Sequence, residues 1–326
     1  MKFLITGANG FVGKALCAEL LRQGKLVRAA VRSANWPIEN VEMVTVGTID
    51  GHTDWSDALH SVDVVIHLAA RVHVMKEAAV DPLAEFLKVN FYGTSNLAQQ
   101  AASAGVKRFV YVSSIKVNGE QTTEAQRYAD SDEPEPQDPY AISKWRAEQD
   151  LWRIAQETGM EVVIIRPPLV YGPGVQGNFI SLMDAIEKGV PLPLAGARNA
   201  RSLVYVGNLV DALIACAEQP AAAGQTYLVS DGETVSTAVL IAKIAQSLER
   251  SNHLFYLPSG ILRAVAVLLG RAEQVDRLFG SLRVNDTKIR AELGWSPPYT
   301  LEQGLRETAD WYRAQRIRYN HGTSKK

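Results

Sequence analysis

The sequence has few cysteines, almost no net charge and no recognisable metal-ligand pattern. Its two cysteines, Cys17 and Cys216, lie far apart in apolar helical patterns, which predicts buried reduced thiols rather than a disulfide framework. Such thiols are typical of a reducing compartment. The formal net charge is −1 at pH 7, so nothing in the charge balance suggests a polyanion partner or a membrane surface. We therefore expect no nucleic-acid partner and no metal.

Long hydrophobic runs are also missing. The apolar residues 1–5 lead directly into a glycine loop and are too short for a signal peptide. The run from Ile261 to Leu269 is broken by Arg263 and is far too short to span a bilayer. The composition is otherwise that of an ordinary globular protein, with 47% hydrophobic and 21% charged residues. We expect a soluble, cytoplasmic protein that does not enter a membrane.

The first half of the chain alternates β-branched runs with helical patterns. Asp81-Pro82 is typical of a helix start, with an N-cap residue followed by proline at the first helical position. We predict strands at residues 3–6, 26–31, 41–46, 62–67, 108–112 and 161–166, and helices at 11–22, 82–104 and 139–157. This alternation predicts an α/β fold with a doubly wound parallel Rossmann sheet.

The pattern changes after residues 171–174, where glycine and proline become frequent. The polar segment 118–138 predicts a mobile surface loop. Helical patterns follow at residues 208–218, 235–248 and 301–313, and short apolar runs at 205–206 and 226–229 are placed to return to the sheet edge. We divide the chain into a Rossmann domain of residues 1–172, joined by 204–230, a smaller α/β substrate domain of residues 173–203 and 231–316, and a tail of residues 317–326.

A glycine loop follows the first strand. Gly7, Gly10 and Gly13 permit a tight turn into a helix, whose N-terminal N–H groups and dipole favour an anion. At this place in the chain, such a loop indicates a dinucleotide pyrophosphate site. The second strand ends in Arg32 instead of the acid that binds the ribose 2′-hydroxyl of NAD. Because a guanidinium suits a 2′-phosphate, we expect NADP, with NAD as the alternative.

Tyr140 and Lys144 are four residues apart and therefore share one face of the helix predicted at 139–157. A phenol has a reference pKa of about 10, and a nearby ammonium favours its phenolate form. Tyr140 is thus a candidate acid–base group for a hydroxyl or a ketone. Ser114 follows the strand at 108–112 and is placed to hydrogen-bond the same oxygen. These residues predict hydride transfer coupled to proton exchange at a carbinol.

Together the motifs resemble those of the extended short-chain dehydrogenases, in the nucleotide-sugar epimerase and dehydratase family. The resemblance covers nearly the whole chain, and it implies that Ser114, Tyr140 and Lys144 are catalytic. It rests on the segments 7–13, 67–70, 90–94, 112–114, 117–119, 140–144, 166–173 and 201–206, and on Asp211.

The same resemblance implies which residues bind cofactor and substrate. The implied cofactor contacts are Gly7, Asn9, Gly10, Phe11, Val12, Gly13, Arg32, Ile49, Leu68, Ala69, Ala70, Asn90, Tyr140, Lys144 and Pro167. The implied substrate contacts are Ser114, Lys116, Asn178 and Arg201. Asn178 and Arg201 are expected to hold the diphosphate of a UDP-sugar, because the forked donors of arginine suit a pyrophosphate.

Two positions depart from the pattern of UDP-galactose 4-epimerases. Those enzymes carry an asparagine where this chain has Leu169, and an acid after the second strand where it has Arg32. A dehydratase would need an acid after the catalytic hydroxyl, where this chain has Ile115-Lys116. The sequence is similar to a bacterial subgroup labelled UDP-glucose 4-epimerase-like, which includes reductases of UDP-4-keto-6-deoxy-N-acetylhexosamines for surface polysaccharides. We therefore rank 4-keto reduction first and 4-epimerisation second.

Two other function classes stay open. One is a short-chain reductase of a non-nucleotide carbonyl such as a steroid, and the clamp predicted at Arg201 counts against it. The other is a binding protein that kept the fold and lost the chemistry, which the intact catalytic residues disfavour. Trp145 and Trp152 share a helix face away from Tyr140. Because this helix forms a dimer interface in the family, we expect a homodimer.

Overall fold

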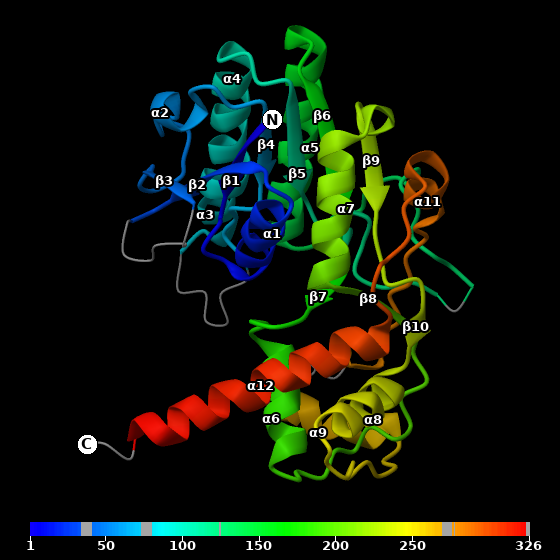
Figure 1. The fold of residues 1–326 in the computed structure, drawn as a ribbon. Coiled ribbons are helices and arrows are strands. Elements are labelled where there is room, and N and C mark those ends of the chain that lie inside the picture. Colours follow the sequence, from blue (N-terminus) through cyan, green and yellow to red (C-terminus); the bar gives the residue numbers. More distant parts are fainter. Residues whose placement is uncertain (34–40, 73–79, 124, 269–275, 277, 324–326) are drawn as a thin grey trace.

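The computed structural model describes residues 1–326 except 34–40, 73–79, 124, 269–275, 277 and 324–326. Its centre is a seven-stranded parallel sheet in the order β3-β2-β1-β4-β5-β6-β9 (Figure 1). The strands are β1 Lys2–Thr6, β2 Leu26–Val31, β3 Glu42–Thr45, β4 Val64–His67, β5 Arg108–Val112, β6 Glu161–Arg166 and β9 Gln225–Leu228. The chain winds one way from β1 to β3 and the other way from β4 onward, so the predicted doubly wound α/β fold is confirmed.

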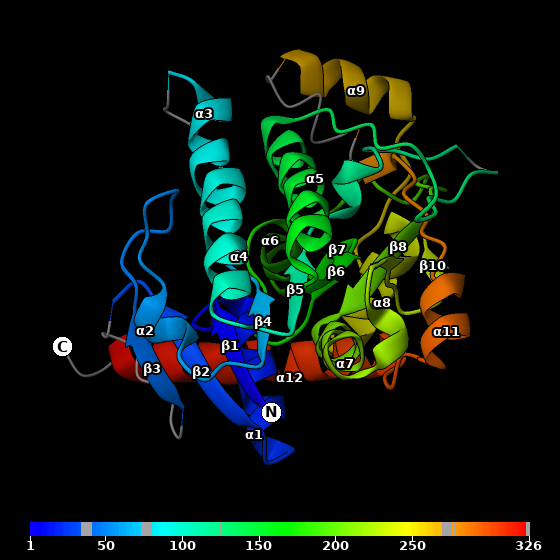
Figure 2. The same ribbon diagram turned by 90° about the horizontal axis from the view of Figure 1, so that it is seen from above.

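Helices cover both faces of the main sheet, as Figure 2 shows from above. On one face α1 (Phe11–Arg22) lies beside α7 (Val206–Glu218), and on the other α4 (Thr94–Ser103) lies beside α5 (Pro139–Thr158). The short helix α2 (Ser56–Leu59) packs on α4. Alternation along a strand supplies both cores: Phe3 and Ile5 of β1 pack toward α1 and α7, whereas Leu4 packs toward α4 and α5.

The helix predicted at 82–104 is continuous in the structure but changes its winding. It begins as α3 (Pro82–Leu87), widens to a π-helix η1 (Lys88–Gly93), and continues as α4. The Asp81 side chain caps α3 by accepting a hydrogen bond of 3.1 Å from the Ala84 N–H. A Cβ on Gly93 would lie 2.7 Å from Cγ2 of Ile49, so the widened turn passes close to the segment after β3. Such π-turns are frequent at functional sites.

A second layer of elements lies beyond the carboxyl ends of the main strands (Figure 1). A three-stranded sheet has the order β10-β8-β7, in which β8 pairs in parallel with β7 and antiparallel with β10. Around it pack helices with a separate core that includes Phe179, Ile241 and Leu305. The bounds are β7 Leu169–Tyr171, β8 Arg201–Tyr205, β10 Thr234–Val235, α6 Asn178–Glu187, α8 Thr237–Ser247, α9 Ser259–Leu268, α11 Thr287–Leu293, α12 Leu301–Thr323, and the 3-10 turns η2 Ile115–Val117 and η3 Pro220–Ala222.

Several sequence predictions for this part of the chain need correction. The run at 205–206 does not join the main sheet, because β8 ends at Tyr205 in the small sheet and α7 begins at once. The run at 226–229 does reach the main sheet, as β9 beside β6. The segment 118–138, predicted to be a mobile surface loop, is anchored at Tyr128, which is buried and whose backbone pairs with residues 283–285. The tail expected from residue 317 is helical through Thr323.

No helix in the described part of the chain is both long and apolar enough to cross a membrane.

Candidate active site

The predicted site residues gather at one edge of the main sheet. The glycine loop follows β1, residues 68–70 follow β4, Ser114 follows β5 and Pro167 follows β6. These strands are parallel, so their carboxyl ends meet at the same edge, around the place between β1 and β4 where the winding direction reverses. Open α/β sheets bind their ligands at this place. Helix α5 runs back against the strands and therefore begins at the same edge, with Tyr140 as its second residue.

The glycine loop is packed so closely that side chains would not fit in it. Gly7 has a φ of +67°, and a Cβ there would lie 2.9 Å from the Ala69 nitrogen. A Cβ on Gly13 would lie 2.2 Å from the Gly7 carbonyl oxygen and 2.7 Å from Cα of Ala8. Gly10 is the N-cap of α1; no side chain caps this helix and its first turn has no acid. Free N–H groups and a positive helix end fit a dinucleotide pyrophosphate.

Arg32 lies beside this loop, exposed to solvent and directly after the end of β2. The register places it there, because Thr6 at the end of β1 pairs with Ala30. Ile49 is buried against η1, at Gly93. Of the other predicted cofactor contacts, Asn9, Phe11, Val12, Leu68, Ala69 and Ala70 are partly buried and Pro167 is buried. The structure thus brings the predicted cofactor residues to one edge, and their contacts with a cofactor stay a prediction.

A chain of hydrogen bonds through Thr6 and the fully buried side chain of His67 fixes residues 68 and 69. The Leu68 and Ala69 N–H groups donate to Oγ1 of Thr6, at 3.2 and 3.1 Å. The Thr6 hydroxyl lies 2.7 Å from Nδ1 of His67, and Nε2 lies 3.0 Å from Oγ1 of Thr94, whose hydroxyl donates to a backbone carbonyl. These partners are satisfied by a neutral imidazole protonated at Nε2. Burial, aided by the charge of Lys144, lowers the pKa of His67 to about 3.

Asn90, in the π-turn, joins the segment after β4 to helix α5. Its Oδ1 accepts from the Arg71 N–H at 2.8 Å, and its Nδ2 donates to the Arg71 carbonyl oxygen and to Oγ of Ser143, both at 3.0 Å. Ser143 in turn donates to the Tyr140 carbonyl oxygen at 2.7 Å. Both amide hydrogens of Asn90 are therefore used within the protein. The side chain sets the position of the start of α5.

Tyr140 and Ser114 meet at the sheet edge, where the Ser114 hydroxyl is near enough to the phenol to affect its pKa. Burial raises the pKa of Tyr140 to about 12, the nearby Asp138 carboxylate adds to the rise, and the interaction with the Ser114 hydroxyl opposes it. Ser114 is the N-cap of η2, and its Oγ accepts from the Lys116 N–H at 3.2 Å. The phenol is thus protonated and has a hydroxyl beside it. This arrangement suits proton donation to a carbonyl oxygen.

Lys144 lies one turn further along α5, with 2% of its surface exposed. Its Nζ is 4.2 Å from the centre of the Tyr111 ring, a cation–π contact. Burial lowers the pKa of Lys144 to about 7, and the charge of Glu148 opposes this effect. Lys144 therefore lies near Ser114 and Tyr140 at the same edge. Its charge depends on the balance between burial, which favours the neutral amine, and the Glu148 carboxylate, which favours the ammonium.

Lys116, a predicted substrate contact, is held by two acids. Its Nζ lies 3.1 Å from Oε1 of Glu120 and forms a close ion pair with Asp138. Asp138 is also the N-cap of α5, where its carboxylate accepts from the Ala141 N–H at 2.7 Å. Lys116 therefore lies close to the start of α5, and a substrate role for it stays a prediction.

The two residues of the predicted diphosphate clamp lie on different elements. Asn178 is exposed at the first turn of α6, and Arg201 is partly buried at the start of β8. The pairing of Leu169 with Leu203 places Arg201 beside the segment that leaves β6. One Arg201 nitrogen donates to the Gly280 carbonyl oxygen at 3.1 Å. Their joint contact with one ligand stays a prediction.

Glu148 and Arg166 form a buried ion pair that the sequence alone did not single out. Glu148 is fully buried and Arg166 is 3% exposed, and their closest atoms are 2.5 Å apart. One signal was available: an acid four residues after Lys144 lies on the same helix face. The position of its partner, at the end of β6, required the tertiary structure.

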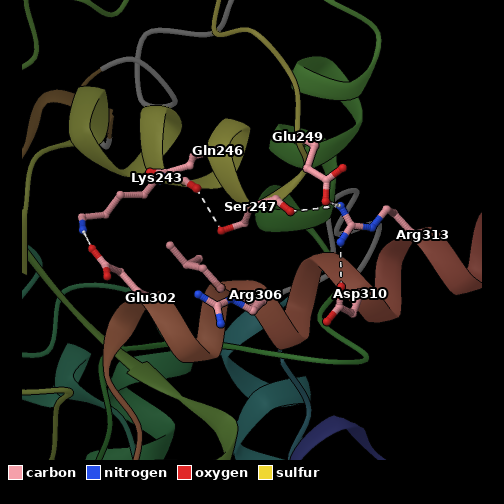
Figure 3. A pocket seen from close by; sticks show the side chains of 9 residues that line it. Lys243, Gln246, Ser247, Glu249, Glu302, Arg306, Asp310 and Arg313 are labelled. Atoms are coloured by element: carbon pink, nitrogen blue, oxygen red, sulfur yellow. Dashed lines mark hydrogen bonds and ion pairs between the residues drawn. The ribbon is translucent and has the colours of Figure 1, made fainter.

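The cavity drawn in Figure 3 lies elsewhere, between α8 and α12. It measures about 370 Å³ and is lined by charges of both signs. Lys243 pairs with Glu302 at 2.6 Å, and Arg313 pairs with Asp310 at 2.6 Å. None of the predicted site residues lines this cavity, so it stands apart from the site at the sheet edge.

The fold and site define an enzyme of the short-chain dehydrogenase type. Residues 3–230 match the family described as "NAD dependent epimerase/dehydratase family", and the chain belongs to that family. It is 44% identical to the UDP-glucose 4-epimerase of Vibrio cholerae over 308 residues, which cover 94% of each chain.

Solved structures agree on the fold. A structure of MoeE5 in complex with UDP-glucuronic acid and NAD is similar with a TM-score of 0.79 and 26% identity, and the match covers 97% of this chain and 100% of the other. The UDP-glucose 4-epimerase of Thermotoga maritima, with a TM-score of 0.77 and 22% identity, matches over 97% of this chain and 99% of its own.

Proposed function

We propose that the protein transfers a hydride at C4 of a UDP-sugar, chiefly as an NADPH-linked reductase of a UDP-4-keto-6-deoxy-N-acetylhexosamine. The observation that carries this proposal is the meeting of Ser114, Tyr140 and Lys144 at the switch edge of the sheet. The similarity to a relative named UDP-glucose 4-epimerase and to a structure that holds UDP-glucuronic acid and NAD supports a UDP-sugar as substrate.

Each of the three residues has a role in carbonyl reduction. The nicotinamide of the cofactor supplies the hydride. Tyr140 donates its proton to the C4 oxygen. Its raised pKa of about 12 keeps the phenol protonated and therefore able to donate. Ser114 hydrogen-bonds the same oxygen, and the Lys144 ammonium stabilises the phenolate that remains. Reduction needs a protonated tyrosine at the start, whereas oxidation of a hydroxyl needs a phenolate.

Two positions favour one hydride transfer over an epimerase cycle. An epimerase holds its cofactor through two transfers while the sugar rotates, and a reductase transfers once and exchanges the cofactor. Leu169, at the position of an epimerase asparagine, is 46% exposed at the start of β7, so it offers an apolar surface instead of an amide. Arg32 is exposed beside the glycine loop, where a guanidinium suits the 2′-phosphate of NADPH.

The second candidate is 4-epimerisation of a UDP-hexose. The observation that favours it is the 44% identity to the Vibrio cholerae protein of that name. The same three residues serve it, with Tyr140 first accepting and then returning the proton.

One set of assays separates the candidates. The purified protein is mixed with UDP-4-keto-6-deoxy-N-acetylhexosamine and NADPH or NADH, and separately with UDP-glucose and NAD. The reductase consumes reduced cofactor in proportion to the keto sugar and prefers NADPH. Interconversion of UDP-glucose and UDP-galactose without net cofactor use would instead establish the epimerase. An Arg32→Asp variant should lose the NADPH preference by at least about tenfold.

We also propose a cytoplasmic homodimer. Helices α4 and α5 lie side by side on one face of the sheet (Figure 2), and Trp145 and Trp152 of α5 are only partly buried there. A second copy packed on this face would cover them.

A further inference from the structure

The face of α5 that carries Tyr140 and Lys144 continues one turn further to Glu148. Residues spaced by four share one face of a helix, and Lys144 and Glu148 are 2% and 0% exposed. A buried carboxylate is costly unless it is paired and hydrogen-bonded. The buried charge of Glu148 therefore requires partners that stabilise it.

Arg166 holds the Glu148 carboxylate by both oxygens. Its Nε lies 3.0 Å from Oε1 and 3.2 Å from Oε2, and a terminal nitrogen lies 2.5 Å from Oε2. The other terminal nitrogen donates to Oδ1 of Asn118 at 3.0 Å, and Nδ2 of Asn118 donates to the Ala129 carbonyl oxygen at 2.8 Å. The guanidinium also lies 5.8 Å from the ring centre of Trp145. The carboxylate thus has a fixed orientation inside the protein.

Three segments of the proposed site meet at this pair. Glu148 belongs to the helix of Tyr140 and Lys144. Arg166 is the last residue of β6, directly before Pro167, and Asn118 follows the turn that begins at Ser114. A single ion pair therefore links all the segments that carry the trio.

Among the residues that the structure describes, Glu148 is the one charge that acts on the pKa of Lys144. On its own helix Lys144 faces the neutral phenol of Tyr140 and the charged Glu148. From β5 the ring of Tyr111 lies against its Nζ, and from β4 the neutral His67 is near enough to be affected by its charge. Beyond Glu148, β6 contributes only the Arg166 cation. Asp138, at the start of the same helix, acts on Tyr140 and is paired with Lys116, so Glu148 is the described anion that acts on Lys144.

We propose that Glu148, held in place by Arg166, is a positioning residue that keeps Lys144 charged and thereby sets the upper pH limit of cofactor binding and turnover. The proposal rests on the function proposed above only in that Lys144 acts on the cofactor and on Tyr140. Burial favours the neutral amine, and a fixed carboxylate one turn away opposes it. A fixed carboxylate one helical turn away, partly offset by the Arg166 cation beside it, is expected to move the titration by about one pH unit.

The sign of the effect follows from the charge. Lys144 is active as a cation, so cofactor affinity and turnover fall as the pH rises through its midpoint. Without the Glu148 charge, the amine loses its proton at lower pH, and the fall begins earlier. Above the wild-type midpoint, the plots of log Kd against pH for wild type and for a variant without the Glu148 charge run in parallel.

The experiment measures the dissociation constant of NADH by fluorescence between about pH 5.5 and pH 9.5, a readout that needs no sugar substrate. Glu148→Gln removes the anion, Glu148→Asp keeps it, and the double variant Glu148→Gln/Arg166→Met removes both charges, so that no buried cation is left unpaired. Glu157→Gln is the matched control, because Glu157 on the same helix pairs with Arg153 at 2.6 Å on the surface. Lys144→Arg, which stays charged, shows whether the midpoint belongs to Lys144.

The proposal expects the midpoint to fall by at least about one pH unit in Glu148→Gln, and by a smaller amount in the double variant, because that variant also removes the opposing Arg166 cation. It expects Glu148→Asp and Glu157→Gln to stay close to wild type, and the midpoint to vanish in Lys144→Arg. If Glu148→Gln does not fold, the midpoint of the double variant tests the proposal instead. Unchanged midpoints in folded variants, with only affinity or melting temperature reduced, would overturn the proposal and leave the pair a structural clamp. Because sugar turnover is measured separately, failure of the proposed reaction leaves this result interpretable.

Discussion

His67 offers a direct test of how the site edge is held. It is fully buried between Thr6 and Thr94, and both ring nitrogens are engaged, at 2.7 and 3.0 Å. Burial and the charge of Lys144 lower its pKa from 6.5 to about 3. The folded protein therefore excludes a proton that the unfolded chain binds readily.

The size of the effect follows from linkage. A group whose folded pKa is lowered contributes stability that is present above its unfolded pKa and is lost as the pH falls. For His67 the loss begins near pH 6.5 and continues toward about pH 3. At about 1.4 kcal/mol for each pH unit, it reaches about 2 kcal/mol by about pH 5.

Urea unfolding at about pH 7.5, 6.5 and 5 measures this loss when wild type is compared with His67→Gln. The His67→Gln variant is less stable than wild type at neutral pH, because it loses hydrogen bonds. It has no imidazole at this position, so it does not lose the stability that wild type loses as the pH falls. The stability gap between the two proteins should therefore narrow by about 2 kcal/mol between neutral pH and about pH 5. His60→Gln, at an exposed position, should run parallel to wild type. A constant gap for His67→Gln would refute the reasoning.

Three further predictions address the rest of the site. Tyr140→Phe should reduce turnover by at least about 100-fold while NADH binding changes little, since only proton transfer is removed; near-normal turnover in a stopped assay would contradict the role. Gly13→Ala should abolish NADH binding, because its Cβ would lie 2.2 Å from a backbone oxygen, whereas Gly260→Ala, where a Cβ meets nothing within 4 Å, should bind normally by fluorescence titration. Light scattering should give twice the mass of one chain, and a Trp152→Glu variant should give the monomer mass; a monomeric wild type would exclude the dimer.

Most of the main sheet was predictable from the sequence, because each strand has a local signature. Buried parallel strands are short apolar runs, and the turns between them are marked by glycine, proline and helix caps. The prediction that the run at 205–206 joins the main sheet was wrong, because it too relied on local hydrophobicity alone. Tyr205 is buried at the end of β8 and Val206 at the start of α7, and local hydrophobicity does not say which sheet a strand joins.

The helix at 82–104 shows another limit of pattern reading. Its apolar spacing predicts one helix, and the chain is indeed helical throughout. The π-turn at Lys88–Gly93 depends on tertiary contacts, namely the close approach of Gly93 to Ile49 and the bonds of Asn90 to Arg71 and Ser143. No local pattern carries that information.

The sequence by itself determined the glycine loop and the Tyr140–Lys144 pair, since both depend on residues that are close along the chain. Only the tertiary structure decided what surrounds them. The ring of Tyr111 against Lys144, the uncharged His67 and the buried Glu148–Arg166 pair each join residues from different strands and helices. These contacts set the charges on which the chemistry depends, because a charge responds to the distance and burial of its neighbours and not to their separation along the chain.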